Sequence, residues 1–139
     1  MTQAHPFGSE ITTEEILENF SFFEDWEEKY GYLIDLGKEL PPLSNDEKIE
    51  EHLIRGCQSQ VWILSEWKED KLYLSADSDA IIVKGLVALV LAAFHGKTAA
   101  EIKAFDIQDY FTQLGLLKHL SPLRGNGLRS MVNYILSLV

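Results

Sequence analysis

Residues 60–95, QVWILSEWKEDKLYLSADSDAIIVKGLVALVLAAFH, contain the pattern that decides the fold. Residues 61–64 and 72–74 are rich in the β-branched, aromatic and other apolar side chains that are common in strands. The polar segment 68–71 lies between them, as a turn does in a hairpin. The pattern therefore predicts two antiparallel strands joined by a tight connection.

The second half of this stretch predicts a long helix over residues 80–95, ended by Gly96. Its apolar run, 81–94, is shorter than the roughly 20 residues that cross a membrane, so we expect a buried core helix. The acidic run Asp77-Ser78-Asp79 would complement the positive end of the helix dipole. These carboxylates also resemble a metal site, but they lack the spacing of a calcium loop, so helix capping is the preferred interpretation.

Helical patterns precede this centre. Thr12 and Glu15 have the spacing of a capping box, and an apolar stripe with helical periodicity follows them. Ser44 and Glu47 predict a further short helix after a pair of prolines. Residues 52–55 fit either the last turn of that helix or a short edge strand.

Further helical patterns follow the centre. Thr98 with Glu101 predicts one capped helix, and Asp106 begins another that Gly115 ends. The segment 121–127, which contains proline and two glycines, is expected to be a loop before a last amphipathic helix. The whole pattern indicates an α+β fold, a small antiparallel sheet packed with helices, in one domain over residues 1–139.

Composition excludes several classes of function. The formal net charge of −10 argues against binding to nucleic acid, which requires clustered Lys and Arg. No secretory signal or membrane span is recognisable, so we expect a cytoplasmic protein. A single cysteine among 139 residues can form neither an internal disulfide nor a cysteine-based zinc or iron–sulfur site within one chain.

Cys57 is the candidate reactive group. It follows Arg55 and Gly56 and precedes Gln58, in a segment expected to be a loop before the first strand. Gly56 would allow a tight turn and close approach to the sulfur, and the Arg55 charge would favour the nucleophilic thiolate. A lone cysteine is nevertheless more often a small buried apolar residue than a nucleophile.

Two other side chains are candidates for supporting Cys57. A hydrolase would need a base beside the thiol, and His119 is the histidine retained for that role. Arg124, between Leu123 and Gly125, could hold a carboxylate or an anionic sulfur. No protease signature, phosphate-binding loop or dinucleotide fingerprint is present in the sequence.

Three segments together resemble the SufE family of sulfur acceptors. They are residues 56–62 (GCQSQVW), residues 77–86 (DSDAIIVKGL), and Leu120-Ser121 with Arg124 and Gly127-Leu128. The early segments 5–8 (HPFG) and 26–30 (WEEKY) are more similar to the CsdE branch of that family. The resemblance implies a SufE/IscU-like fold with about three antiparallel strands.

The resemblance also implies a function. Cys57 would receive persulfide sulfur from a PLP-dependent cysteine desulfurase and pass it to a downstream acceptor protein, in iron–sulfur cluster assembly or another sulfur-using pathway. The PLP would belong to the partner, and the chain would be a carrier and activator with no cofactor, metal or catalysis of its own. Two alternatives stay open: a docking module with an inert Cys57, and an independent thiol enzyme with His119 as base.

Overall fold

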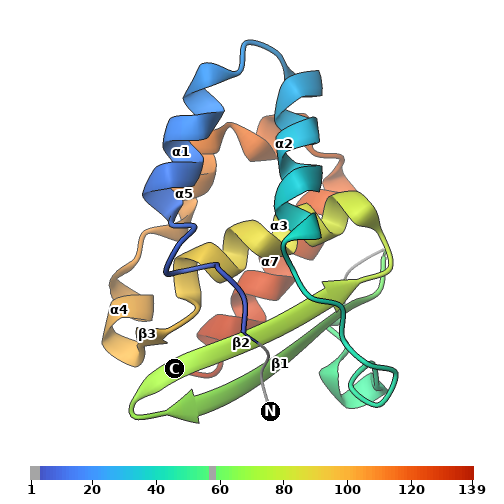
Figure 1. The fold of residues 1–139 in the computed structure, drawn as a ribbon, viewed down its shortest axis with the longest axis vertical. Helices are drawn as coiled ribbons and strands as arrows, with labels where there is room; N and C mark the ends of the chain where they lie inside the picture. The colour runs from blue at the N-terminus through green and yellow to red at the C-terminus, as the bar shows by residue number, and fades with distance from the viewer. Residues whose placement is uncertain (1–3, 57–58) are drawn as a thin grey trace.

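A computed structural model describes residues 4–56 and 59–139, and it has the α+β architecture that the sequence predicts. Helices and strands alternate unevenly along the chain, with the two long strands in the middle (Figure 1). In chain order the elements are α1 (Thr13–Phe22), α2 (Trp26–Lys38), the 3₁₀ helix η1 (Glu50–His52), β1 (Val61–Lys68), β2 (Lys71–Ser78), α3 (Ile81–Phe94), β3 (Lys97–Thr98), α4 (Ala99–Ala104), α5 (Ile107–Leu114), α6 (Leu116–His119) and α7 (Pro122–Leu136).

The predicted hairpin is confirmed, and its strands are longer than the sequence pattern indicated. β1 and β2 pair antiparallel from Val61 opposite Ser78 to Lys68 opposite Lys71. Only Glu69 and Asp70 connect them, both with positive φ, as a two-residue hairpin turn requires. The third strand, β3, pairs with the start of β2 and gives the sheet order β1-β2-β3. Its position had no signal in the sequence.

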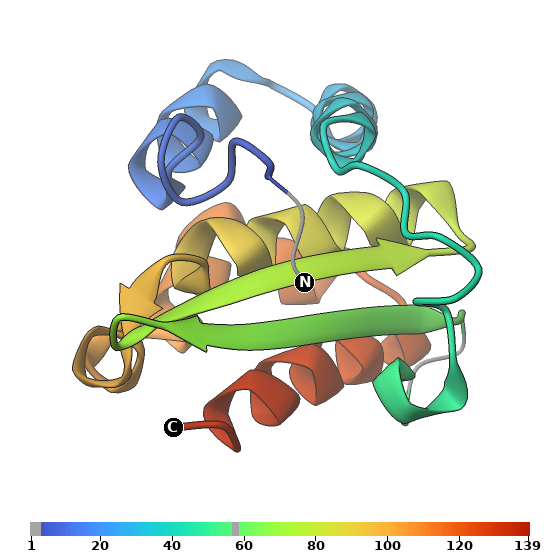
Figure 2. The same cartoon turned by 60° about the horizontal axis from the view of Figure 1, so that its bottom comes forward.

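The apolar helix α3 lies at the centre of the molecule. It packs against β2 on one side and against α1, α2 and α7 on others, so that nearly all of its residues from Val83 to Phe94 are buried (Figures 1 and 2). A helix that is apolar on all sides is stable only when other elements surround it. None of the helices in the described residues is long and apolar enough to span a membrane.

Close packing between α2 and α3 depends on two glycines. A Cβ atom on Gly37 would lie 2.9 Å from the backbone nitrogen of Gly85, and one on Gly85 would overlap the carbonyl oxygen of Leu33. Both positions therefore require the absence of a side chain. These contacts hold α2 directly against α3, the helix that follows the hairpin.

Three sequence predictions were wrong. The run Asp77-Ser78-Asp79 does not cap α3: Asp77 and Ser78 belong to β2, and Ala80 precedes the helix without a side-chain cap. Residues 45–47 form a turn closed by Ser44 and do not form a helix. The predicted loop 121–127 is mostly helix, because Ser121 caps α7 and Pro122 occupies its first turn, where no N–H is needed.

Candidate functional site

The residues before and after the Cys57 segment contact each other at the start of β1. Cys57 and Gln58 lie outside the described residues, so the site is defined by what precedes and follows them. Ile54 donates its N–H to the carbonyl of Val61 at 2.8 Å, and Leu53 forms an antiparallel bridge with Trp62. Residues 53–54 therefore lie beside residues 61–62 at the start of β1. The segment of sequence that contains Cys57 connects these two points. Residues 52–55, which the sequence left undecided, are a 3₁₀ end at His52 followed by this short bridge.

Gln60, the residue before β1, is hydrogen-bonded to residues 78 and 79 at the end of β2. Gln60 donates its N–H to the Asp79 carboxylate at 3.0 Å. Its carbonyl accepts the Asp79 N–H at 3.2 Å and the Ser78 hydroxyl at 2.7 Å. Both backbone groups of Gln60 are thus fixed by two consecutive residues of the run that was predicted to be a helix cap.

Helix α7 lies close to Gly56, the residue before Cys57. Gly56 has a φ of +89°, which side-chain-bearing residues rarely adopt, and a Cβ atom there would lie 2.5 Å from the Ser130 hydroxyl oxygen. Gly56 thus allows the turn that the sequence predicted, but the neighbour that it admits in this structure is α7. Arg55 is exposed and forms a 2.7 Å ion pair with Glu50, which offsets part of its charge.

Asp77 connects this region to the loop before η1. Its buried carboxylate accepts the N–H groups of Leu43 and Ser78 and lies 3.2 Å from the Lys48 ammonium and 3.3 Å from that of Lys84. Burial opposes ionisation of this carboxyl, but the two N–H groups and the two lysines outweigh it and hold the pKa of Asp77 below its usual value. Asp77 therefore joins the loop, β2 and α3 through one charged group.

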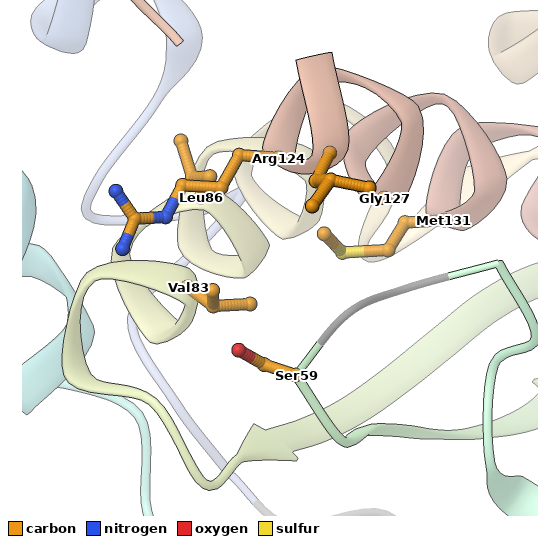
Figure 3. Close-up of a pocket in the computed structure, with 7 residues that line it drawn as sticks. Ser59, Val83, Leu86, Arg124, Gly127 and Met131 are labelled. Atoms are coloured by element: carbon orange, nitrogen blue, oxygen red, sulfur yellow. The ribbon is translucent and has the colours of Figure 1, made fainter. Parts of the chain in front are cut away.

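A small pocket lies beside the segment, between α3 and α7 (Figure 3). Its volume of about 20 Å³ is enough for roughly one water-sized group. Figure 3 shows Ser59, two residues after Cys57, with its side chain directed toward Val83, and the Met131 thioether entering from α7. The lining is mainly apolar: Ser59, Val83, Leu86, Leu123, Arg124, Gly127 and Met131.

The two supporting residues predicted from the sequence lie in different places. Arg124 lines this pocket from the first turn of α7, and its guanidinium extends toward the start of α3 (Figure 3). The His119 ring instead stacks on Trp26 of α2, with the ring centroids 4.1 Å apart, and its carbonyl accepts the Tyr30 hydroxyl. The structure does not place His119 among the described residues that line the pocket.

The arrangement suits a small anionic or polarisable group more than it suits a metal. The pocket walls are apolar, and among the described residues of the lining Arg124 supplies the one positive charge. Across residues 4–56 and 59–139, His, Cys, Asp and Glu side chains form no group of three or more that could hold a metal ion. The sequence gives no separate signal for Ser59, just before β1, or for Ser78, at the end of β2, because serines in such places have no distinctive spacing.

Comparisons with known proteins agree with the family resemblance. The SufE family, described as an Fe-S metabolism associated domain, matches residues 14–139. An uncharacterized SufE-like protein of Rhizobium etli is 45% identical over 126 residues, which cover 88% of this chain and 85% of that protein. Another from Rhizobium meliloti is 44% identical over 128 residues, covering 89% and 91%.

A solved structure supports the fold independently. The solution structure of a hypothetical protein from Thermus thermophilus superposes with a TM-score of 0.71 over 90% of each chain. The two sequences are 19% identical, so this likeness concerns the arrangement of helices and strands alone.

Proposed function

Because the chain belongs to the SufE family, whose domain is associated with Fe–S metabolism, we propose that it accepts persulfide sulfur on Cys57 and passes it on. The donor is a PLP-dependent cysteine desulfurase, and the recipient is a downstream sulfur acceptor protein. The PLP belongs to the desulfurase, and this chain catalyses no reaction alone. The segments 5–8 and 26–30 are more similar to the CsdE branch of the family, and we propose that the chain belongs to that branch.

The chemistry is a thiol–persulfide exchange. The Cys57 thiolate attacks the outer sulfur of the partner's persulfide, a new S–S bond forms on Cys57, and the partner's S–S bond breaks to release its thiolate. The rate of such an exchange depends on the thiolate fraction, on its nucleophilicity and on access to the sulfur. It needs no dedicated acid–base pair, so the position of His119 against Trp26 is compatible with the proposal.

The observation that carries the proposal is the way in which the structure holds the neighbours of Cys57. Ser59 lines a pocket of apolar side chains with Arg124 in its wall. A persulfide is anionic near neutral pH, and a guanidinium stabilises an anion in a site that contains little water. Apolar walls limit the access of small thiols, which would otherwise attack the persulfide and remove its outer sulfur.

Intact-mass measurement tests the proposal. The protein and its Cys57→Ser variant are incubated with a cysteine desulfurase, PLP and free cysteine. We expect the wild-type protein alone to gain sulfur, and a reductant to remove it. If a desulfurase binds the protein and sustains turnover but transfers no sulfur, the carrier role is wrong and the chain is a docking module.

A further inference from the structure

Ser78 connects three elements at the point where the Cys57 segment joins the sheet. Its hydroxyl donates to the carbonyl of Gln60 at 2.7 Å and accepts the N–H of Ala80 at 3.2 Å. It thereby joins the residue before β1, the end of β2 and the start of α3. We propose that Ser78 is a positioning residue for sulfur acceptance, which rests on the proposed role of Cys57.

The Ser78 bond differs from the other two bonds of Gln60 in its exposure to solvent. Gln60 and Asp79 are both exposed, so water competes for the hydrogen bonds between them. Ser78 is only 6% exposed, and its hydroxyl has both a donor and an acceptor role occupied. Of the three contacts to Gln60, the one from Ser78 is the least replaceable by water.

Removal of this hydroxyl should loosen the anchor without unfolding the protein. The Gln60 carbonyl would keep the Asp79 N–H as a partner. The Ala80 N–H would lose its acceptor, but Ala80 is only partly buried, so the cost is small compared with that of a fully buried donor. Gln60 is the third residue after Cys57, and transfer between two sulfur atoms depends on their alignment. A misplacement of about 1 Å in a reacting group can reduce a rate by up to roughly a hundredfold.

The test compares Ser78→Ala with Ser78→Thr, which keeps a hydroxyl, and with Ser75→Ala. Ser75 is a matched control because it lies in the same strand, is buried to a similar degree and pairs with Leu64, away from Gln60. Hydrogen exchange of the Gln60 and Asp79 amides reports the anchor without any desulfurase. Single-turnover sulfur transfer at varied desulfurase concentration separates the maximal rate from the concentration at half-saturation.

We expect Ser78→Ala to speed amide exchange at Gln60 and Asp79. It should also lower the maximal transfer rate about tenfold, less than the roughly hundredfold loss that a full misplacement of about 1 Å can cause. The desulfurase concentration at half-saturation should not change. Ser78→Thr should recover most of the rate, and Ser75→Ala should keep it. Unchanged amide exchange in Ser78→Ala, or an equal loss of rate in Ser75→Ala, overturns the positioning role. If the wild-type protein accepts no sulfur, the proposed function fails, whereas the exchange measurement still decides whether Ser78 anchors Gln60.

Discussion

The imidazole rings of His5 and His95 lie 4.1 Å apart and hold the same backbone residue of β2. His95 accepts the N–H of Leu74 on Nδ1 at 3.0 Å, and His5 Nε2 lies 2.7 Å from the Leu74 carbonyl. His5 also accepts the Phe7 N–H on Nδ1, so its proton is on Nε2 and donates to that carbonyl. The neutral forms of both rings thus fasten the N-terminal arm, with its fully buried Phe7, to the sheet.

Acidification should destabilise the fold through this histidine pair. Burial, followed by repulsion from His5, lowers the pKa of His95 from 6.5 to about 4. Because the unfolded chain takes up this proton more readily, stability is complete above about pH 6.5 and is lost as the pH falls toward 4. We expect a loss on the order of 2 kcal/mol after allowance for partial exposure of the ring, measured by urea unfolding between pH 7 and pH 4.

The variant His95→Asn supplies the control for the pH effect. An asparagine carbonyl can accept the Leu74 N–H but does not titrate, so the difference in stability between pH 7 and pH 4 should shrink. His52→Gln removes a histidine that contacts the carbonyl of Glu47 in a different part of the molecule, so this substitution should leave the slope unchanged. An equal slope in wild type and His95→Asn would show that the pair is not the source.

Asp77→Asn should be strongly destabilising, and more so than the loss of the exposed Asp35 charge. The substitution leaves Lys48 and Lys84, which are 30% and 21% exposed, without their carboxylate. Removal of one partner from a buried ion pair costs about 3 kcal/mol or more. Asp35→Asn is the control, because the 3.8 Å pair of Asp35 with Lys38 is exposed and should contribute less than about 1 kcal/mol.

The pH dependence provides a second test of Asp77. Since its pKa is depressed in the folded state, its stabilising contribution is complete above the unfolded value of about 4 and is lost as the pH falls further. The stability curve of Asp77→Asn should therefore be flatter than that of the wild type below about pH 4. A parallel course of the two curves would contradict the assignment of the pKa shift to this carboxyl.

Local signals in the sequence predicted the parts of the fold that local interactions determine. The Thr98–Glu101 capping box was read correctly because its two hydrogen bonds join residues three apart. Asp77 was misread because an acid before a helix is the usual pattern of a cap, whereas its partners Leu43 and Lys48 are distant in sequence. Ser121 followed by Pro122 is a typical helix start and does begin α7, but the two nearby glycines led to the prediction of a loop.

The candidate site was predictable in part for the same reason. The sequence selected Cys57 as the lone cysteine and Arg124 as a possible anion-binding side chain, and the structure places Arg124 in the pocket beside Ser59. His119 was predicted only as a histidine near Arg124 in sequence, and its ring packs on Trp26. The anchoring of Gln60 by Ser78 depends on strand register, which no single residue reveals.

Two glycines in helices should respond to alanine in opposite ways. A methyl group on Gly31 of α2 would meet no atom of the described residues within 4 Å, so Gly31→Ala should raise stability by about 0.5–1 kcal/mol through helix propensity. Gly85→Ala gains the same propensity but forces α3 away from the Leu33 carbonyl, and should cost about 2 kcal/mol or more. Urea unfolding decides the signs, and a stabilised Gly85→Ala would refute close α2–α3 packing.

Alanine at Gly56 should disturb the Cys57 segment through two separable effects. The φ of +89° costs a side-chain-bearing residue about 1–2 kcal/mol, and the added methyl group would press on the Ser130 hydroxyl. Replacing Ser130 by alanine removes the clashing oxygen, since the next nearest atom lies 3.5 Å away. Gly56→Ala should therefore be less destabilising in the Ser130→Ala background.

A double-mutant cycle on Gly56 and Ser130 measures the second effect alone. We expect a coupling of about 1 kcal/mol in urea unfolding, with sulfur acceptance partly restored in the double variant. Gly96→Ala is the matched control, because Gly96 has a φ of +74° but no atom of the described chain within 4 Å of the added methyl group, so it carries the backbone strain only. If Gly96→Ala and Gly56→Ala cost the same and the cycle shows no coupling, α7 does not press on the segment. A clear coupling would mean that α7 limits the conformations of the chain beside Cys57, since the methyl group on residue 56 has no other close neighbour in the described structure.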